Sequence, residues 1–274
     1  MKKPIVSLLQ MDVKIADVRH NMEKAAKLFE KAASRRSDFI CLPEMWSTGF
    51  AYEDFLTIAK ASFEDTIYFL SYWAKNSMAF VIGGSIPEPE NSVPALPVRQ
   101  AGGRQGKVYN TSLIFDPSGK QIGSYRKIHI FSPTGEDRHF GRGKKIEVFI
   151  TKPAKIAVEI CYDIRFPELT GKYREKGAKM VFVPAQFPSV RADHWLTLLK
   201  ARAIENHIFM FGCNRTGKDI HEYQGESVIY DPFGKTVEKA SHKEEVLTAQ
   251  IDLSLIDEAN DSIPIEKDRM PEIY

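Results

Sequence analysis

Two nearly identical turns divide this chain into halves of the same design. They read F-D-P-S-G-K at residues 115–120 and Y-D-P-F-G-K at residues 230–235. Proline at the second position and glycine at the fourth favour a type I turn. The turns therefore predict two hairpins, which pair residues 109–115 with 121–125 and residues 227–230 with 235–239. A D-P-x-G turn is common by itself, so the argument for a repeat depends on what precedes each turn.

The segments before the two turns follow the same order. Short apolar runs typical of buried strands alternate with amphipathic helical patterns. The first half has strands at 5–9, 39–42 and 80–85 and helices at 17–34 and 62–76; the second has strands at 155–160, 180–183 and 208–213 and helices at 168–176 and 193–206. This order predicts an α/β fold, a four-layer α-β-β-α sandwich of two similar β-α-β-α-β-β halves.

Composition narrows the class of protein further. The chain has 274 residues, enough for one large domain or two, and its hydrophobic content of 43% is ordinary for a globular protein. We interpret residues 1–274 as a single domain with a tail at about 254–274. A net charge of +2 without a concentrated basic face argues against a nucleic-acid partner. No segment approaches the ~20 apolar residues that a membrane helix needs, so no membrane partner is expected.

Cysteine usage and the first residues indicate a cellular compartment. Three cysteines, an odd number without C-x-x-C spacing, suggest neither a disulfide framework nor a zinc knuckle. The apolar run that follows Met1 is interrupted by Gln10 and Asp12, and no cleavage pattern follows it, so we do not expect a secretion signal. A reducing cytoplasm fits these features.

Two segments fall outside the repeat. Residues 87–106 are rich in proline and glycine and predict a long irregular loop, which would be a lid or a mobile insertion. Their G-G-R-Q-G-K sequence lacks the P-loop pattern, which argues against phosphate binding. Residues 126–145 connect the halves and are crowded with ionisable groups, which suggests a site.

A cysteine lies where a strand of the second half ends. Residues 157–169 read A-V-E-I-C-Y-D-I-R-F-P-E-L, an apolar run that breaks at Pro167 before a helix-like segment. Side chains at the carboxyl ends of strands project into the crevice where α/β sheets place their ligands. A nearby helix start could stabilise a thiolate there. Cys161 is therefore a candidate nucleophile, although free cysteine is also often a buried structural residue, and this stretch alone leaves both interpretations open.

Three motifs together resemble the nitrilase superfamily of carbon–nitrogen hydrolases. They are L-P-E-M at 42–45, Y-R-K-I-H at 125–129 and I-C-Y-D-I-R-F-P-E at 160–168, and the resemblance covers nearly the whole chain. It implies that Cys161 forms a thioester acyl-enzyme and that Glu44 is the base that takes the thiol proton. Lys127 and the Tyr162 backbone N–H would stabilise the oxyanion. Glu136 matches the family's second glutamate, which would orient Lys127 and the substrate.

Two alternatives concern these same residues. Without the resemblance, Glu44 and Lys127 could be an ordinary ion pair. A papain-like site in which His194 acts as the base for Cys161 is also conceivable, but it would leave Glu44 and Lys127 without roles.

A metal site is the third alternative. His129, Glu136 and His139 could supply ligands, yet their i, i+7, i+10 spacing matches no common ligand signature. We therefore expect neither a metal nor a cofactor.

The neighbourhood of the cysteine also has features of its own. Asp163, Arg165 and Glu168 are expected to pair with one another and to fix the bend after the strand. Glu159 stands where the family commonly has a small residue, and the 87–106 loop is longer than expected. We expect these two departures to affect the shape of the entrance to the site, and hence which substrate the site accepts.

Further motifs resemble the ω-amidase-like branch of the superfamily. They are C-Y-D-I-R-F-P-E, D-H-W at 193–195, A-R-A-I-E-N at 201–206, G-C-N-R at 212–215 and S-I-P at 262–264. This likeness implies a small-molecule amide substrate, the terminal amide of a dicarboxylic or 2-oxo dicarboxylic monoamide. The alternatives are an N-carbamoyl amino acid hydrolase, or another carbon–nitrogen hydrolase, and a catalytically silent binding module. The presence of Glu44, Lys127 and Cys161 argues against a silent module.

The resemblance also implies a homodimer or a higher even oligomer. The family commonly assembles through the helices that correspond to 168–176 and 193–206. Large side chains there, namely Tyr173, Trp195, Leu198, Leu199 and Ile204, exceed what packing on one sheet obviously requires, and the 254–274 tail could cross to a partner subunit. The alternative is a monomer in which these residues are core.

Overall fold

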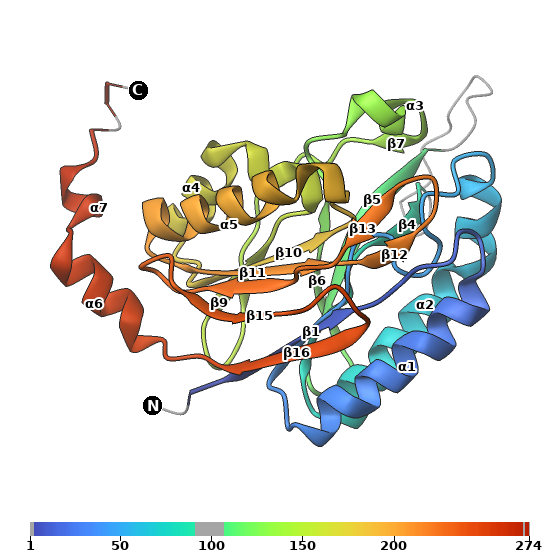
Figure 1. Ribbon diagram of the computed structural model, residues 1–274, viewed down its shortest axis with the longest axis horizontal. Coiled ribbons are helices and arrows are strands. Elements are labelled where there is room, and N and C mark those ends of the chain that lie inside the picture. The colour runs from blue at the N-terminus through green and yellow to red at the C-terminus, as the bar shows by residue number, and fades with distance from the viewer. Residues whose placement is uncertain (1–2, 91–106, 271, 274) are drawn as a thin grey trace, which may run out of the picture.

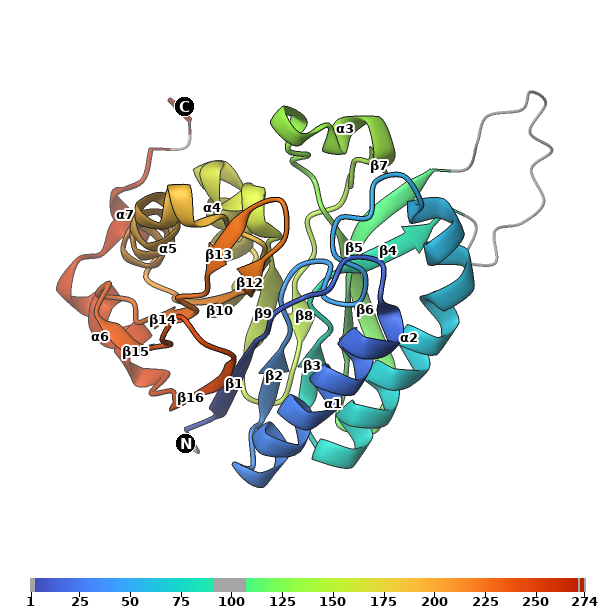
Figure 2. The same ribbon diagram turned by 45° about the vertical axis from the view of Figure 1, so that its right-hand side comes forward.

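Two β-sheets pack face to face, and helices cover the outer side of each. The computed structural model describes residues 3–90, 107–270 and 272–273. Helices α1 and α2 lie outside one sheet and α4 and α5 outside the other, so the layers run α-β-β-α (Figures 1 and 2). The predicted sandwich is confirmed. In the described ranges, no helix combines the length and apolarity needed to cross a bilayer.

The first sheet is built on three parallel strands joined by α1 (Val18–Ser34) and α2 (Phe55–Ser77). Its strand order is β16-β1-β2-β3-β5-β4, and β6 and β7 also pair with β5. The bounds are β1 Ile5–Gln10, β2 Phe39–Cys41, β3 Phe80–Ile82, β4 Ile86–Pro89, β5 Val108–Phe115, β6 Gln121–Arg126, β7 Phe140–Gly141 and β16 Glu245–Gln250.

The second sheet repeats the three parallel strands, here joined by α4 (Pro167–Glu175) and α5 (Ala192–Asn206). Its strand order is β15-β14-β11-β10-β9-β8. The bounds are β8 Phe149–Ile150, β9 Lys155–Val158, β10 Met180–Ala185, β11 Phe209–Asn214, β14 Val228–Tyr230 and β15 Thr236–Lys239. A separate ribbon pairs β12 (Thr216–Lys218) with β13 (Glu222–Gln224).

Short helical segments and the C-terminal helices complete the chain. They are η1 Ser132–Thr134, α3 Glu136–His139, η2 Cys161–Arg165, η3 Ser189–Arg191, α6 Ser254–Ser262 and α7 Ile265–Asp268.

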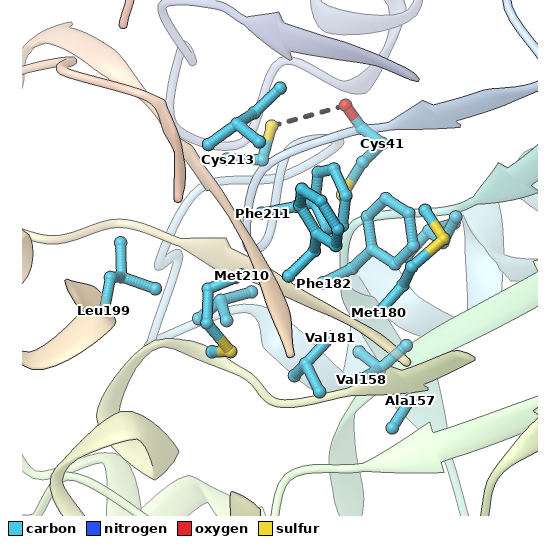
Figure 3. Close-up of a cluster of buried hydrophobic side chains, with 14 of the residues drawn as sticks. Cys41, Ala157, Val158, Met180, Val181, Phe182, Leu199, Met210, Phe211 and Cys213 are labelled. Carbon is cyan, nitrogen blue, oxygen red and sulfur yellow. Dashed lines mark hydrogen bonds between the residues drawn. The ribbon is translucent and has the colours of Figure 1, made fainter. Parts of the chain in front are cut away.

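Alternating side chains hold the layers together. Phe39 and Cys41 of β2 point into the core between the sheets, whereas Ile40 packs under α1 and α2. The Phe39 ring lies 5.7 Å from the ring of Phe182 in the opposite sheet. Beside them, the Cys213 thiol donates a hydrogen bond to the Cys41 carbonyl over 3.3 Å (Figure 3). This packing sets strand ends of the two sheets against each other.

Several elements differ from the sequence-based expectation. Helix α2 begins at Phe55, seven residues earlier than predicted, because Phe55 and Ala59 continue its buried stripe. Strand β4 occupies the start of the predicted 87–106 loop; its prolines are tolerated because β4 is an edge strand. Residues 91–106 of that loop lie outside the described residues. The β12–β13 ribbon and β16 were not predicted.

The apolar surplus expected on the helices of the second half is largely absent. Tyr173, Trp195 and Leu199 are 0%, 1% and 0% exposed within their own chain, so the expectation was wrong for these three. Leu198 is partly buried, and Ile204 is 43% exposed.

The described part of the tail lies against its own chain. Asn260 Oδ1 accepts a hydrogen bond from His207 Nδ1 over 3.0 Å, and Arg269 donates one to the Glu205 carbonyl over 3.3 Å. Helices α6 and α7 thus run past the end of α5 (Figure 1).

Glu159, the residue that departs from the family pattern, faces the core and does not line the entrance. Its side chain is fully buried, Oε1 accepts a hydrogen bond from Thr170 over 2.5 Å, and Oε2 has no partner in the described structure. Burial outweighs that hydrogen bond and raises the pKa of Glu159 to about 8.

This carboxyl group should make the fold pH-sensitive. Its pKa lies near 4.3 in the unfolded chain, so the folded state keeps a proton that the unfolded state loses, and stability should fall as pH rises from about 4.5 to 8. We expect Glu159→Gln to remove a slope of up to about 1.4 kcal/mol per pH unit, measured by urea unfolding across that window. Exposed Glu147→Gln is the matched control. An unchanged slope in Glu159→Gln would contradict this account.

Candidate active site

The residues predicted from the motifs meet in one cavity of about 460 Å³. Glu44 follows β2, Lys127 follows β6, and Cys161 opens η2 just beyond β9. Glu136 opens α3, and Tyr162 lies next to Cys161. All five line the cavity, and apolar side chains form much of the remaining wall, among them Ile15, Phe50, Phe131, Phe187 and Ile220.

A buried ammonium group joins the two glutamates. Lys127 Nζ lies 2.8 Å from Glu44 Oε1 and 2.9 and 3.0 Å from the two carboxylate oxygens of Glu136. The side chains of Glu44, Lys127 and Glu136 are only 1%, 2% and 1% exposed. Breaking such a buried pair by removing one partner typically costs about 3–5 kcal/mol, so the three charges hold one another in place.

Asn110 of β5 completes this cluster, and the sequence analysis missed it. Its side-chain amide donates to Glu44 Oε1 over 2.9 Å and to Glu136 Oε1 over 3.2 Å. Asn110 is fully buried, and the sequence offered little signal for it, because the next two residues of the same strand, Thr111 and Ser112, are polar as well. A neutral donor placed between two carboxylates fixes both without adding charge.

The charges determine the protonation states of the lysine and the cysteine. Burial lowers the pKa of Lys127, but Glu136 and Glu44 outweigh it and hold the pKa well above its usual value, so the group is an ammonium. Burial and then Glu44 raise the pKa of the Cys161 thiol well above its usual value, with Lys127 opposing them. The resting sulfur is therefore a thiol, and it needs a base.

The backbone at the cysteine has an unusual conformation. Cys161 has a φ of +48°, in the left-handed region that non-glycine residues rarely adopt. The Ile160 N–H donates to Asp163 Oδ2 over 2.9 Å, and the Asp163 N–H returns a bond to the Ile160 carbonyl over 3.0 Å. This closed loop holds Cys161 in a tight elbow at the strand end.

Asp163 also connects the elbow to the segment that carries Lys127. Tyr125 Oη donates to Asp163 Oδ2 over 2.7 Å, and the His129 backbone N–H donates to Oδ1 over 2.9 Å. The predicted pairing among Asp163, Arg165 and Glu168 was therefore wrong. Apart from Ile160, the partners of the buried Asp163 carboxylate lie more than thirty residues away in sequence, two positions on either side of Lys127.

The structure separates the residues of the other candidate sites. His194 does not line the cavity and lies 3.2 Å from an Arg165 nitrogen, so it is not positioned as a base for Cys161. His129 stacks on Phe166 and His139 lies beside Tyr52. Among the described residues, no three His, Cys, Asp or Glu side chains are grouped to hold a metal ion.

Two arginines give the cavity a cationic side. Arg165 packs over the Phe187 ring at 5.5 Å and Arg191 over the Phe131 ring at 5.4 Å, and both line the cavity. In the described part of the chain, neither guanidinium has a carboxylate partner. An anionic group of a ligand could therefore be bound there.

Fold and site together define the class of protein. A four-layer sandwich that gathers a cysteine, a lysine and two glutamates in one cavity is a nitrilase-like hydrolase. The chain belongs to the carbon–nitrogen hydrolase family, whose model matches residues 5–261. It is thus an enzyme that hydrolyses carbon–nitrogen bonds other than peptide bonds, and the resemblance found in the sequence is confirmed.

Named relatives and a solved structure agree with this assignment. The chain is 34% identical over 270 residues to a 2-oxoglutaramate amidase from Bacillus subtilis, with 98% of each sequence covered. It is 30% identical to omega-amidase NIT3 from Saccharomyces cerevisiae, covering 98% of this chain and 94% of the relative. The crystal structure of S. cerevisiae Nit3, a member of branch 10 of the nitrilase superfamily, superposes with a TM-score of 0.83 at 28% identity, covering 96% and 95% of the two chains.

Removing the central ammonium group should impair turnover. We expect Lys127→Ala to lower kcat by at least ~10²-fold if Lys127 supports an oxyanion, measured by ammonia release. Because two buried carboxylates would then lack a cation, circular dichroism must first show that the variant is folded. Exposed Lys120→Ala is the control. A loss below about tenfold in folded protein would reduce Lys127 to a structural ion pair.

Proposed function

We propose that this chain hydrolyses the terminal amide of a small dicarboxylic or 2-oxo dicarboxylic monoamide to carboxylate and ammonia, as an ω-amidase-like enzyme. The observation that carries the proposal is the Lys127 ammonium held between Glu44 and Glu136 in the cavity that also exposes Cys161. It places a nucleophile, a base and an electrophilic cation around one volume.

Acylation would begin at the thiol. Glu44 takes the proton of Cys161 as the sulfur attacks the amide carbon, and the oxyanion that forms is stabilised by the Lys127 ammonium and the Tyr162 N–H. Glu44 then passes the proton to the departing nitrogen. Ammonia leaves, and a thioester remains on Cys161.

In deacylation, Glu44 would move a proton from water to the sulfur of Cys161. Water enters after ammonia has left, and Glu44 takes a proton from it while the oxygen attacks the thioester. The same oxyanion donors act again. The carboxylic acid leaves, the thiol of Cys161 regains its proton, and the sum is amide plus water to carboxylate plus ammonium. Glu136 and Asn110 act by orienting Lys127 and Glu44.

The cationic wall supports an acidic substrate. Arg165 and Arg191 are the groups that would bind the carboxylate at the far end of the acyl chain. The names of the relatives, 2-oxoglutaramate amidase and omega-amidase, agree with such a substrate.

The same arginines favour a second candidate, an N-carbamoyl amino acid. That substrate also carries a carboxylate, and its hydrolysis releases carbon dioxide as well as ammonia. The product therefore distinguishes the two candidates directly.

Other parts of the proposal concern the setting of the enzyme. We propose a cytoplasmic location, supported by the free state of all three cysteines, and a reaction that needs no metal and no cofactor. Residues 1–274 would act as one catalytic domain without a nucleic-acid or membrane partner.

A homodimer, or a higher even oligomer, is also proposed. Ile204 on α5 and Ile263 after α6 are 43% and 58% exposed, and they are apolar side chains that an interface between two copies would cover. Light scattering at micromolar concentration should give a mass of about twice 31.1 kDa, or a higher even multiple of it. We also propose that the tail from about residue 254 crosses to a partner subunit. A fully active species near 31 kDa would contradict both the oligomer and the crossing tail.

A substrate panel tests the proposed reaction. Glutaramate, 2-oxoglutaramate, butyramide and N-carbamoyl-β-alanine are compared by ammonia and carbon dioxide release in the presence of EDTA. The ω-amides should exceed neutral butyramide in kcat/KM by at least about tenfold and release no carbon dioxide. Cys161→Ala should abolish turnover, because the thioester route is lost. Preferred hydrolysis of the carbamoyl compound, or activity lost to EDTA and restored by zinc, would overturn the proposal.

Matched variants show whether the arginines select the carboxylate. Arg165→Gln and Arg191→Gln should raise KM for glutaramate more than for butyramide, because only the former presents an anion. Arg142→Gln, at an exposed arginine outside the cavity, is the control.

A further inference from the structure

One buried arginine lies outside the proposed chemistry, yet it connects two parts of the site. Arg215 follows β11 and its side chain is 0% exposed, although it does not line the cavity. Burying a guanidinium is costly unless its donors are satisfied. Asp12 and the Val13 carbonyl bind one terminal nitrogen at 3.0 and 2.8 Å. The other terminal nitrogen faces the site.

On one side Arg215 holds a hairpin that lines the cavity. We call residues 216–224, which comprise β12, β13 and the turn between them, the cavity hairpin. Arg215 Nη1 lies 2.5 Å from Asp219 Oδ2, and the guanidinium lies over the Tyr223 ring, 4.2 Å from its centroid. Asp219, Ile220, His221 and Tyr223 of this hairpin all line the cavity. The position of that wall therefore depends on Arg215.

On the other side Arg215 holds the residue that supports the base. Its Nη1 also donates to Gln186 Oε1 over 3.1 Å. Gln186 in turn donates twice to Glu44, from its side-chain nitrogen to the carbonyl over 2.8 Å and from its backbone N–H to Oε2 over 3.0 Å. The Gln186 side-chain amide, fixed at both ends, thus links Arg215 to the main chain of Glu44, and the backbone N–H of the same residue holds the Glu44 carboxylate.

We propose that Arg215 is a positioning residue that couples the cavity hairpin to the base Glu44 through Gln186. The proposal rests on the assignment of Glu44 as the base. Arg215 acts without touching substrate. One arm sets the wall that receives the acyl chain, and the other reaches the main chain of Glu44 through the Gln186 side-chain amide, and so positions the residue whose carboxylate accepts the thiol proton. Loss of the guanidinium contacts of Arg215 should therefore raise KM, because the cavity hairpin is no longer held, and lower kcat, because Glu44 is no longer positioned.

The test uses Arg215→Lys, which keeps the buried charge but cannot reach Asp12, Asp219 and Gln186 together. We expect kcat to fall about tenfold and KM to rise several-fold. Gln186→Leu should reproduce the loss in kcat. In the double variant, kcat should fall no further, whereas the rise in KM due to Arg215→Lys should persist. Additive losses in kcat would overturn the coupling.

A second measurement does not need the substrate. The rate at which iodoacetamide alkylates Cys161, followed by peptide mass spectrometry, depends on the base that removes the thiol proton. Arg215→Lys and Gln186→Leu should slow it about tenfold each and no further together. Equal rates in wild type and Arg215→Lys would overturn the proposal. Failure of the wild type to release ammonia from any amide would instead overturn the proposed function, so the two failures are distinguishable.

Controls guard against a purely structural effect. Arg174→Lys changes a half-buried arginine of α4, which donates to the Asn206 carbonyl over 2.9 Å and contacts neither Glu44, the cavity hairpin nor the Cys161–Arg165 segment, and it should leave both measurements within about twofold. If Arg215→Lys does not fold, Gln186→Leu and Asp219→Asn test the arms separately. The first should slow alkylation, and the second should raise KM with kcat unchanged; any other pattern would contradict the proposal.

Discussion

The site depends on the Lys127 ammonium between the carboxylates of Glu44 and Glu136. In a poorly solvated cavity none of these charges is stable alone, so each is held by the other two. The cluster carries one more negative than positive charge and lies beside a thiol that is protonated at rest. In the proposed mechanism the same arrangement supplies a proton acceptor and a fixed cation, without a metal or a cofactor.

The fold brings these charges together from distant segments. Glu44 follows β2 of the first sheet and Cys161 follows β9 of the second, and core residues such as Phe39 and Phe182 pack these sheets together. Asp163 then joins the Cys161 elbow to residues on both sides of Lys127. Packing of the core thus brings the two sheets together, and buried hydrogen bonds fix the position of the Cys161 sulfur relative to the Lys127 ammonium.

The sequence analysis succeeded where local patterns carry the information. Apolar periodicity and the two D-P-x-G turns predicted the layers. Three motifs and the family resemblance that they carry predicted Glu44, Lys127, Glu136, Cys161 and Tyr162, which share one cavity. It failed where partners lie far apart in the chain. Asp163 was paired with Arg165 and Glu168 because two of its true partners, Tyr125 and His129, are remote in sequence, and Asn110 looked like one more strand residue. Likewise β4 was hidden by prolines that only an edge strand tolerates.

The central claim is that an acyl group passes through the sulfur of Cys161. Rapid acid quenching of the enzyme during turnover of an ω-amide, followed by intact and peptide mass spectrometry, tests it most directly. The account predicts an added mass equal to the amide minus ammonia, located on Cys161 and lost in Cys161→Ala. An adduct on Cys41 or Cys213, or full turnover by Cys161→Ala, would contradict it.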